Sequence, residues 1–132
     1  MKLLFVCTGN TCRSPMAAGL FSCLRPDIVS ESAGLHAAEG FPASAHAVRA
    51  AAALGADISG HRSRCLTAEI AEAADLIIAL GAYHEEALRA RYPHKRVILL
   101  GSGIDDPYGE DLEAYKECAM QIFEALEKMN NE

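Results

Sequence analysis

Short apolar runs alternate with amphipathic stretches along the whole chain. The first run, "KLLFVC" at 2–7, is continuous and apolar, as expected of a strand that is covered on both faces. Further strand candidates are 27–34, which is more polar, and the apolar runs 75–80 and 96–100. The stretches with helical periodicity are 14–25, 43–55, 67–73, 83–92 and 112–129.

Local signals support several of these helix boundaries. Ser14 followed by Pro15 is typical of an N-cap and a first helical residue. Gly55 is suited to end the Ala-rich helix, and Thr67 to cap the short helix that follows. Pro93 stops the helix before it, because proline lacks the N–H that a continuing helix needs.

This alternation predicts an α/β fold, namely a single domain over 1–132 with an open four-stranded parallel sheet and helices on both faces. No linker, repeat or low-complexity tract divides the chain. In such sheets, ligands bind at the carboxyl ends of the strands, near a topological switch. The loops 7–14 and 101–110 both follow strands, so we expect them to lie side by side at that edge.

Composition and charge narrow the function classes. The chain has 132 residues, of which 51% are hydrophobic and 23% charged, with a formal net charge of -6. An acidic chain without a Lys or Arg run is a poor binder of the nucleic acid backbone, although a local anion site is compatible with that total. No stretch reaches the roughly 18 apolar residues that a membrane span needs. We therefore expect no nucleic acid partner and no membrane partner.

The five cysteines are odd in number, and their spacing fits no disulfide framework or metal knuckle. We expect a cytoplasmic protein with reduced thiols and without a secretory signal. No group of residues has metal-ligand spacing, and we expect neither a metal nor a cofactor. We interpret Cys23, Cys65 and Cys118 as structural thiols; His46, His84 and His94 as helix-surface residues; and His36 as uninformative.

The loop after the first strand carries the clearest chemistry. Cys7 and Arg13 form a C-x5-R pattern that joins a strand end to a helix start. Backbone N–H groups in such a curl, together with the helix N-terminus, favour a bound anion. Gly9 and Asn10 tolerate the positive φ that a tight curl requires, and the guanidinium of Arg13 can grip two phosphate oxygens. All of these groups favour a thiolate at Cys7, which would be a nucleophile aimed at a bound oxyanion.

Cys12 lies inside this loop, and two interpretations of it stay open. It is either a small, partly buried residue or a redox partner. In the second case it forms a disulfide with Cys7 and shields the nucleophile from irreversible oxidation.

The segment "VCTGNTCRSPMA" resembles the signature loop of the low-molecular-weight protein tyrosine phosphatases. The resemblance continues through "SAG", "SGHRSRCLT", "ADLIIAL" and "DDPYG", and so covers essentially the whole chain in order. It implies a four-stranded parallel sheet flanked by helices, which agrees with the hydrophobic pattern. It also implies that the partners are phosphorylated proteins; we expect a monomer.

The resemblance implies a role for each residue of the site. Cys7 attacks phosphorus and forms a phosphocysteine, Arg13 holds the phosphoryl oxygens, and Asp106 protonates the leaving atom before activating water. Ser14 bonds the Cys7 sulfur, and His61 supports the loop shape that Asn10 holds. The remaining candidates for substrate or phosphate binding are Thr8, Gly9, Thr11, Cys12 and Tyr108.

The role of Asp106 also follows from general chemistry. A thiolate expels a phosphate-linked group efficiently only if the leaving atom is protonated as it departs. A single carboxyl group can act first as the acid and then as the base. Asp106 precedes Pro107, which fixes an extended backbone on a loop after a strand. We interpret the neighbouring Asp105 as a solvated turn residue.

Two departures from the tyrosine-directed members bear on the substrate. Position 11 is Thr where those members usually carry an aliphatic residue, and only Tyr108 follows the Asp-Pro pair where they tend to have two aromatics. Both features resemble the bacterial protein arginine phosphatase branch. The Thr11 hydroxyl can meet a guanidinium group, and Asp106 suits a planar cation. We therefore predict a protein phosphoarginine phosphatase, with a tyrosine phosphatase as the alternative. A third departure, Ala18 in place of the usual Glu, has no interpretation at this stage.

Two other classes are less favoured. An arsenate reductase on this fold needs relay cysteines after the third strand, and 81–92 contains none. Its loop would also carry Gln in place of Pro15. An arsenate reductase would therefore need Cys65 or Cys118 to lie close to Cys7. A module that only binds phosphorylated groups needs neither a thiolate nor an acid, so Cys7, Arg13 and Asp106 together argue against it.

Overall fold

The structure is a computed structural model that describes residues 1–131. The sheet has four parallel strands in the order β2-β1-β3-β4. Their bounds are β1 Lys2–Cys7, β2 Val29–Gly34, β3 Leu76–Ala79 and β4 Val97–Leu99. The chain turns one way from β1 to β2 and the other way to β3, so the switch point lies at the carboxyl ends of β1 and β3. This confirms the predicted α/β fold.

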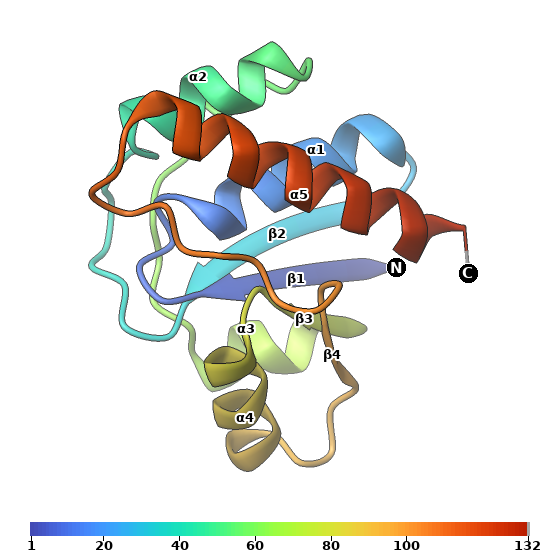
Figure 1. The fold of residues 1–132 in the computed structure, drawn as a ribbon. Coiled ribbons are helices and arrows are strands. Elements are labelled where there is room, and N and C mark those ends of the chain that lie inside the picture. The colour runs from blue at the N-terminus through green and yellow to red at the C-terminus, as the bar shows by residue number, and fades with distance from the viewer. Residues whose placement is uncertain (132) are drawn as a thin grey trace.

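Helices cover both faces of the sheet. The bounds are α1 Arg13–Leu24, α2 Ala45–Ala53, α3 Ala68–Ala73, α4 Ala82–Arg91 and α5 Leu112–Asn130. Figure 1 shows α1, α2 and α5 on one face and α3 and α4 on the other. Two hydrophobic clusters fill these layers. The larger packs the side chains of β1 and β3 against α1, α2 and α5, and the smaller lies under α3 and α4.

The predicted elements agree with the observed ones to within about two residues at each end. One local prediction was wrong: Cys12 is the N-cap of α1, and Ser14 and Pro15 lie inside the first turn. The Ser14 side chain is fully buried and bonds to the loop, so it is not free to cap the helix. The predicted caps of other helices hold: Thr67 accepts from Ile70 N at 3.2 Å, and Gly55 adopts a φ of 93° just after α2.

The sheet brings the two loops of interest to one edge. The loop 101–110 leaves β4 and returns across the end of β3, where Ile104 N donates to Leu80 O at 2.7 Å. The loop 8–12 leaves β1 at the same edge, directly beside β3. Across residues 1–131, no helix is long and apolar enough to cross a membrane.

Candidate active site

The loop after β1 curls because Asn10 sits in the left-handed region, with a φ of 57°. Asparagine tolerates this conformation better than most residues. Its buried side chain is bonded on every side: Nδ2 donates to Ser14 Oγ at 2.8 Å and to Ser32 Oγ at 2.9 Å, and Oδ1 accepts from Arg64 N at 3.0 Å. These contacts tie the loop to α1, to β2 and to the segment before α3.

His61 supports the same residue from outside. Its Nε2 donates to the backbone oxygen of Asn10 at 2.6 Å, since a carbonyl can only accept. Burial lowers the pKa of His61, the bond to Asn10 raises it, and the charges of Arg62 and Arg64 lower it further. The net direction is downward, which keeps the ring neutral at pH 7. The predicted contact between His61 and the loop is therefore present.

Cys7 ends β1 at the base of the loop and is 3% exposed. Its sulfur lies 2.9 Å from Ser14 Oγ. The hydroxyl of Ser14 has one proton, and Asn10 Nδ2 already donates to its oxygen, so this proton is free for the sulfur. A hydrogen bond of this kind stabilises a thiolate more than a neutral thiol.

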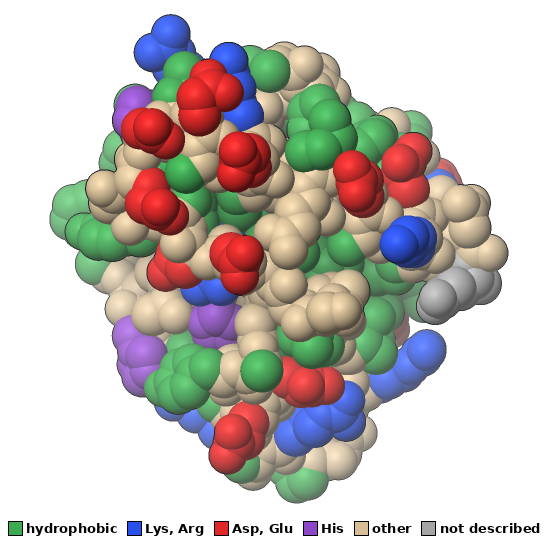
Figure 2. Space-filling model, in the orientation of Figure 1, with side chains coloured by type: hydrophobic (Ala, Val, Ile, Leu, Met, Phe, Trp, Pro, Cys, Tyr) green, Lys and Arg blue, Asp and Glu red, His purple; other side chains and the backbone are tan. Residues whose placement is uncertain are grey.

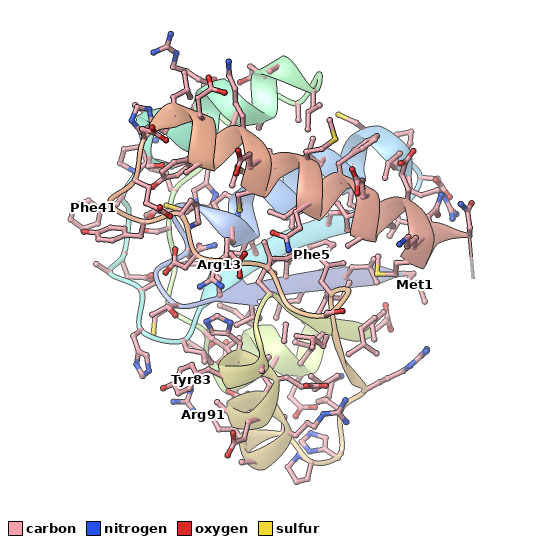
Figure 3. The ribbon with its side chains drawn as sticks, in the orientation of Figure 1. Met1, Phe5, Arg13, Phe41, Tyr83 and Arg91 are labelled. Atoms are coloured by element: carbon pink, nitrogen blue, oxygen red, sulfur yellow. The ribbon has the colours of Figure 1, made fainter. Side chains whose placement is uncertain are left out.

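Arg13 and Asp106 lie close together although they come from distant parts of the chain. The Arg13 side chain is buried, and its Nη1 donates to Ile104 O at 2.9 Å, which fixes the guanidinium against the loop 101–110. Its Nη2 lies 3.6 Å from Asp106 Oδ2. Figure 3 shows Arg13 between the start of α1 and this loop. The Asp106 carboxyl is half exposed, and its other oxygen accepts from Tyr108 N at 3.1 Å.

These groups line one cavity of about 270 Å³. The cavity lies between the loop after β1 and the loop 101–110. Its lining consists of the predicted site residues Cys7, Thr8, Gly9, Asn10, Thr11, Cys12, Arg13, Asp106 and Tyr108. Of the predicted binding residues, only Ser14 lies behind the cavity wall. In chemical terms, the cavity can hold an oxyanion against Arg13 and the loop amides, with a sulfur below it and a carboxyl group at its side.

A larger cavity of about 370 Å³ lies on the other side of α1. It contains no cysteine, and its lining includes Ala18, Ser32, His61 and Arg64. It therefore borders the supports of Asn10 and not the nucleophile. Ala18 and His61 line this cavity together, so the small side chain of Ala18 leaves open space beside His61.

The buried His84 is a residue that sequence reasoning misassigned. It was expected on a helix surface, but it is 2% exposed and its Nε2 lies 2.8 Å from Thr8 Oγ1. Burial, followed by the charge of Arg13, lowers its pKa to about 4. A signal was present in the chain: His84 lies just after the end of the central strand β3, at the same edge as the loop after β1.

The other histidines lie outside the cavity. His36 and His94 are exposed, with His94 in the turn after α4, where it pairs with Glu72. His46 on α2 is half-buried, with its ring 5.3 Å from that of Tyr115.

No disulfide joins the cysteines within residues 1–131. Cys12 is buried between α2 and α5, where its sulfur lies 3.3 Å from the Tyr115 hydroxyl and 3.6 Å from Ser44 Oγ. Cys118 donates to Asp105 O at 3.6 Å, and burial raises its pKa to about 12. Within residues 1–131, no three His, Cys, Asp or Glu side chains are grouped to hold a metal ion.

Fold and cavity together define a class: α/β proteins with a cysteine at the base of a curled loop that leads into a helix, and a carboxyl group supplied by a second loop. The family model described as "Low molecular weight phosphotyrosine protein phosphatase" matches residues 2–132. The chain belongs to this family of protein phosphatases, and it is a phosphatase hydrolase by that membership.

Named relatives fall into two groups by substrate. The chain is 40% identical to the probable low molecular weight protein-tyrosine-phosphatase EpsP of Ralstonia solanacearum, over 91% of this chain and 87% of that protein. It is 34% identical to a protein-arginine-phosphatase of Geobacillus stearothermophilus, over 97% and 93%. A crystal structure of the low molecular weight protein tyrosine phosphatase from T. tengcongensis covers 99% of the chain and 98% of that structure, with a TM-score of 0.93 and 40% identity.

Proposed function

We propose that this phosphatase hydrolyses phosphoarginine in proteins through a phosphocysteine intermediate. The observation that carries the substrate assignment is that Thr11 and Asp106 line the same cavity as Cys7. They bring a hydroxyl and a carboxyl group to the walls of the cavity, and both can bond a guanidinium group.

In the first step, the Cys7 thiolate attacks phosphorus while Arg13 and the loop amides hold the phosphoryl oxygens. The bond from phosphorus to the leaving nitrogen breaks, and protonated Asp106 gives that nitrogen its proton. In the second step, the Asp106 carboxylate takes a proton from water. The hydroxide attacks the phosphocysteine, inorganic phosphate leaves, and the Cys7 thiolate is restored. Protons and electron pairs balance without a cofactor.

The position of Asp106 supports its roles in both steps, first as the acid and then as the base. Its carboxyl group is half exposed and lies on the loop that holds Arg13 through Ile104. It therefore borders the phosphoryl site yet can exchange protons with solvent. A carboxylate at this place also pairs with the planar cation that remains when phosphoarginine loses its phosphoryl group.

Phosphotyrosine is the second candidate, and the exposed Tyr108 favours it. Tyr108 is 77% exposed and lines the cavity, so its ring can stack on a flat aryl group. The tyrosine-phosphatase relatives at 40% identity support the same substrate.

A paired peptide assay separates the candidates. One peptide sequence is made with phosphoarginine and with phosphotyrosine, and kcat/KM is measured for each. We expect the phosphoarginine peptide to be turned over at least ten-fold faster, because a site with polar partners for a substrate discriminates better than one that only fits its shape. Equal or faster turnover of the phosphotyrosine peptide would overturn the assignment.

Two variants at one position locate the selector. Thr11→Ile removes the hydroxyl and keeps the branched shape, and we expect it to shift preference toward phosphotyrosine. Thr11→Ser keeps the hydroxyl and should preserve the preference for phosphoarginine. An unchanged preference in Thr11→Ile would show that Thr11 does not select the substrate.

A further inference from the structure

His84 is a buried group for which the mechanism above has no use. It lies in the first turn of α4 and is 2% exposed. Its Nε2 is 2.8 Å from Thr8 Oγ1, the hydroxyl of the first residue in the phosphate-binding loop. Its Nδ1 is also buried but has no hydrogen-bond partner among residues 1–131. One ring nitrogen is therefore bonded to the loop, and the other is not.

The unbonded nitrogen and the Arg13 guanidinium both border Gly81. A β-carbon on Gly81 would lie 3.2 Å from His84 Nδ1 and 3.4 Å from Arg13 Nη1, so both nitrogens border the open side of this glycine. A guanidinium group carries only donors and a positive charge. A ring nitrogen in the field of that charge is more stable with a lone pair than with a proton.

This environment fixes the protonation of the ring. Burial and the Arg13 charge lower the pKa of His84 to about 4, Asp106 raises it, and His36 lowers it further. The aromatic ring of Tyr83 packs edge-on at 5.7 Å. At pH 7 the ring is neutral and holds one proton. A proton on Nδ1 would leave a buried donor without an acceptor in the described part of the chain and in the field of a cation, whereas a proton on Nε2 is bonded to Thr8.

We propose that His84 is a positioning residue that makes the Thr8 hydroxyl a hydrogen-bond donor to the phosphoryl group. The Nε2–H of His84 donates to Thr8 Oγ1, so the single hydroxyl proton of Thr8 is free. Thr8 is exposed and lines the cavity. Its proton is then donated to an oxygen of the group bound there, in addition to the donors from the loop amides and Arg13. This inference rests on the proposed phosphatase chemistry.

The tautomer is tested first, in the wild-type protein. Long-range proton–nitrogen NMR of the imidazole rings distinguishes a protonated from an unprotonated ring nitrogen. We expect His84 to carry its proton on Nε2, with no titration of the ring between about pH 5.5 and 8. A proton on Nδ1, or a ring that titrates in this range, overturns the proposal.

Kinetics test the consequence. Thr8→Val and His84→Leu each remove one side of the bond, and Thr8→Ser and His84→Gln each retain a group able to make it. With para-nitrophenyl phosphate as substrate, we expect the first pair to weaken inhibition by inorganic phosphate about ten-fold and to lower kcat/KM by a similar factor, the size of one hydrogen bond to a charged group. Thr8→Ser and His84→Gln should keep both the phosphate inhibition and kcat/KM close to the wild-type values.

The double variant Thr8→Val/His84→Leu should be no worse than Thr8→Val alone, because His84 acts through Thr8. Additive losses in the double variant would contradict the inference that His84 acts through Thr8. His94→Leu is the matched control, since His94 is exposed in the turn after α4 and should change neither value. If His84→Leu does not fold, Thr8→Val and the tautomer still decide the question. Unchanged phosphate inhibition in Thr8→Val overturns the proposal.

The two proposals can fail separately. A wild-type protein that binds inorganic phosphate but does not hydrolyse para-nitrophenyl phosphate would refute the catalytic function. The contribution of Thr8 and His84 to phosphate binding would still be measurable by calorimetry on the same variants.

Discussion

The guanidinium of Arg13 and the carboxyl group of Asp106 face each other across the cavity, with 3.6 Å between Nη2 and Oδ2. The two side chains differ in exposure, since the Arg13 side chain is 9% exposed and that of Asp106 is 53% exposed. Exposed ion pairs at this separation are weak. The fixed cation can therefore hold an oxyanion while the carboxyl group moves toward the leaving atom.

Asp106→Asn tests the acid directly. The amide keeps the size of the side chain but cannot give up a proton, so we expect kcat for a phosphoarginine peptide to fall about 10²–10⁴-fold. The loss should be smaller for para-nitrophenyl phosphate, whose leaving oxygen needs less protonation. Steady-state kinetics on both substrates measure this difference. Asp105→Asn is the matched control, and an equal effect at the two positions would contradict the assignment.

Asn10 tests the shape of the loop. Asn10→Gly keeps the freedom to adopt a φ of 57° but loses the side-chain bonds to Ser14, Ser32 and Arg64, whereas Asn10→Ala loses both. We expect Asn10→Ala to be destabilised by roughly 1–3 kcal/mol and Asn10→Gly to be the milder change, since alanine is strained at positive φ. Denaturant unfolding gives the two free energies. The reverse order would mean that the backbone conformation is not what Asn10 provides.

Gly34, at the end of β2, lies against the same loop. A β-carbon there would lie 2.5 Å from Thr8 O and 3.0 Å from Asn10 N, both of them backbone atoms. Gly34→Ala must therefore displace the loop, and we expect a loss of phosphate binding together with about 1–3 kcal/mol of stability. Phosphate titration and thermal unfolding check the two effects. Gly60→Ala is the control, because open space surrounds Gly60; equal behaviour would contradict the steric argument.

The sequence predicted the sheet because its strands are apolar runs of the right length, and it predicted the site because Cys7 and Arg13 flank a short loop. The meeting of the loops 7–14 and 101–110 was also predicted, whereas most individual side-chain contacts between distant segments could not be. Nothing near Gly34 or Ser32 indicates that they touch Asn10, because that contact depends on the pairing of β2 with β1. His84 was misassigned because helical periodicity does not say which helix turn abuts the end of a neighbouring strand. Ser14 was misassigned only as the N-cap of α1: its hydroxyl bonds Cys7, as the resemblance implied, and Asn10 instead of the helix backbone.

The low pKa of His84 makes stability depend on pH. The pKa falls from an ordinary 6.5 to about 4 on folding, so the unfolded chain binds this proton more tightly. The contribution of His84 to the free energy of unfolding is fully present above about pH 6.5. It is lost as pH falls toward 4, by roughly 3 kcal/mol for a group this buried. His61 acts in the same direction.

Denaturant unfolding of wild type and of His84→Gln at pH 7 and pH 4.5 checks this dependence. The variant has no ring to protonate, so its stability should fall less over that interval than the wild type's. Parallel losses in the two proteins would show that carboxyl groups, not His84, determine the acid sensitivity.

Exposed acidic side chains gather in the loop before α5 and on the first turns of that helix. These residues, which we term the acidic rim, are Asp105, Glu110, Asp111, Glu113 and Glu117. Figure 2 shows acidic side chains gathered on this part of the surface. The field of the acidic rim attracts cationic segments and repels anionic ones. Phosphorylated peptides with Lys or Arg beside the modified residue should therefore show a kcat/KM about ten-fold above that of peptides with Asp or Glu there, at low ionic strength.

Salt separates this effect from direct contact. The preference should shrink as ionic strength rises toward about 0.15 M, where charges are screened within roughly 8 Å. Glu110→Gln/Glu113→Gln should reduce it at low salt, while Glu69→Gln, on α3 at the opposite face of the sheet, should not. Asp111 is unsuitable for this test because it caps α5 by accepting from Ala114 N at 3.0 Å. A preference that persists unchanged at high salt would place the selectivity in the cavity, with Thr11 and Asp106, and not in the rim.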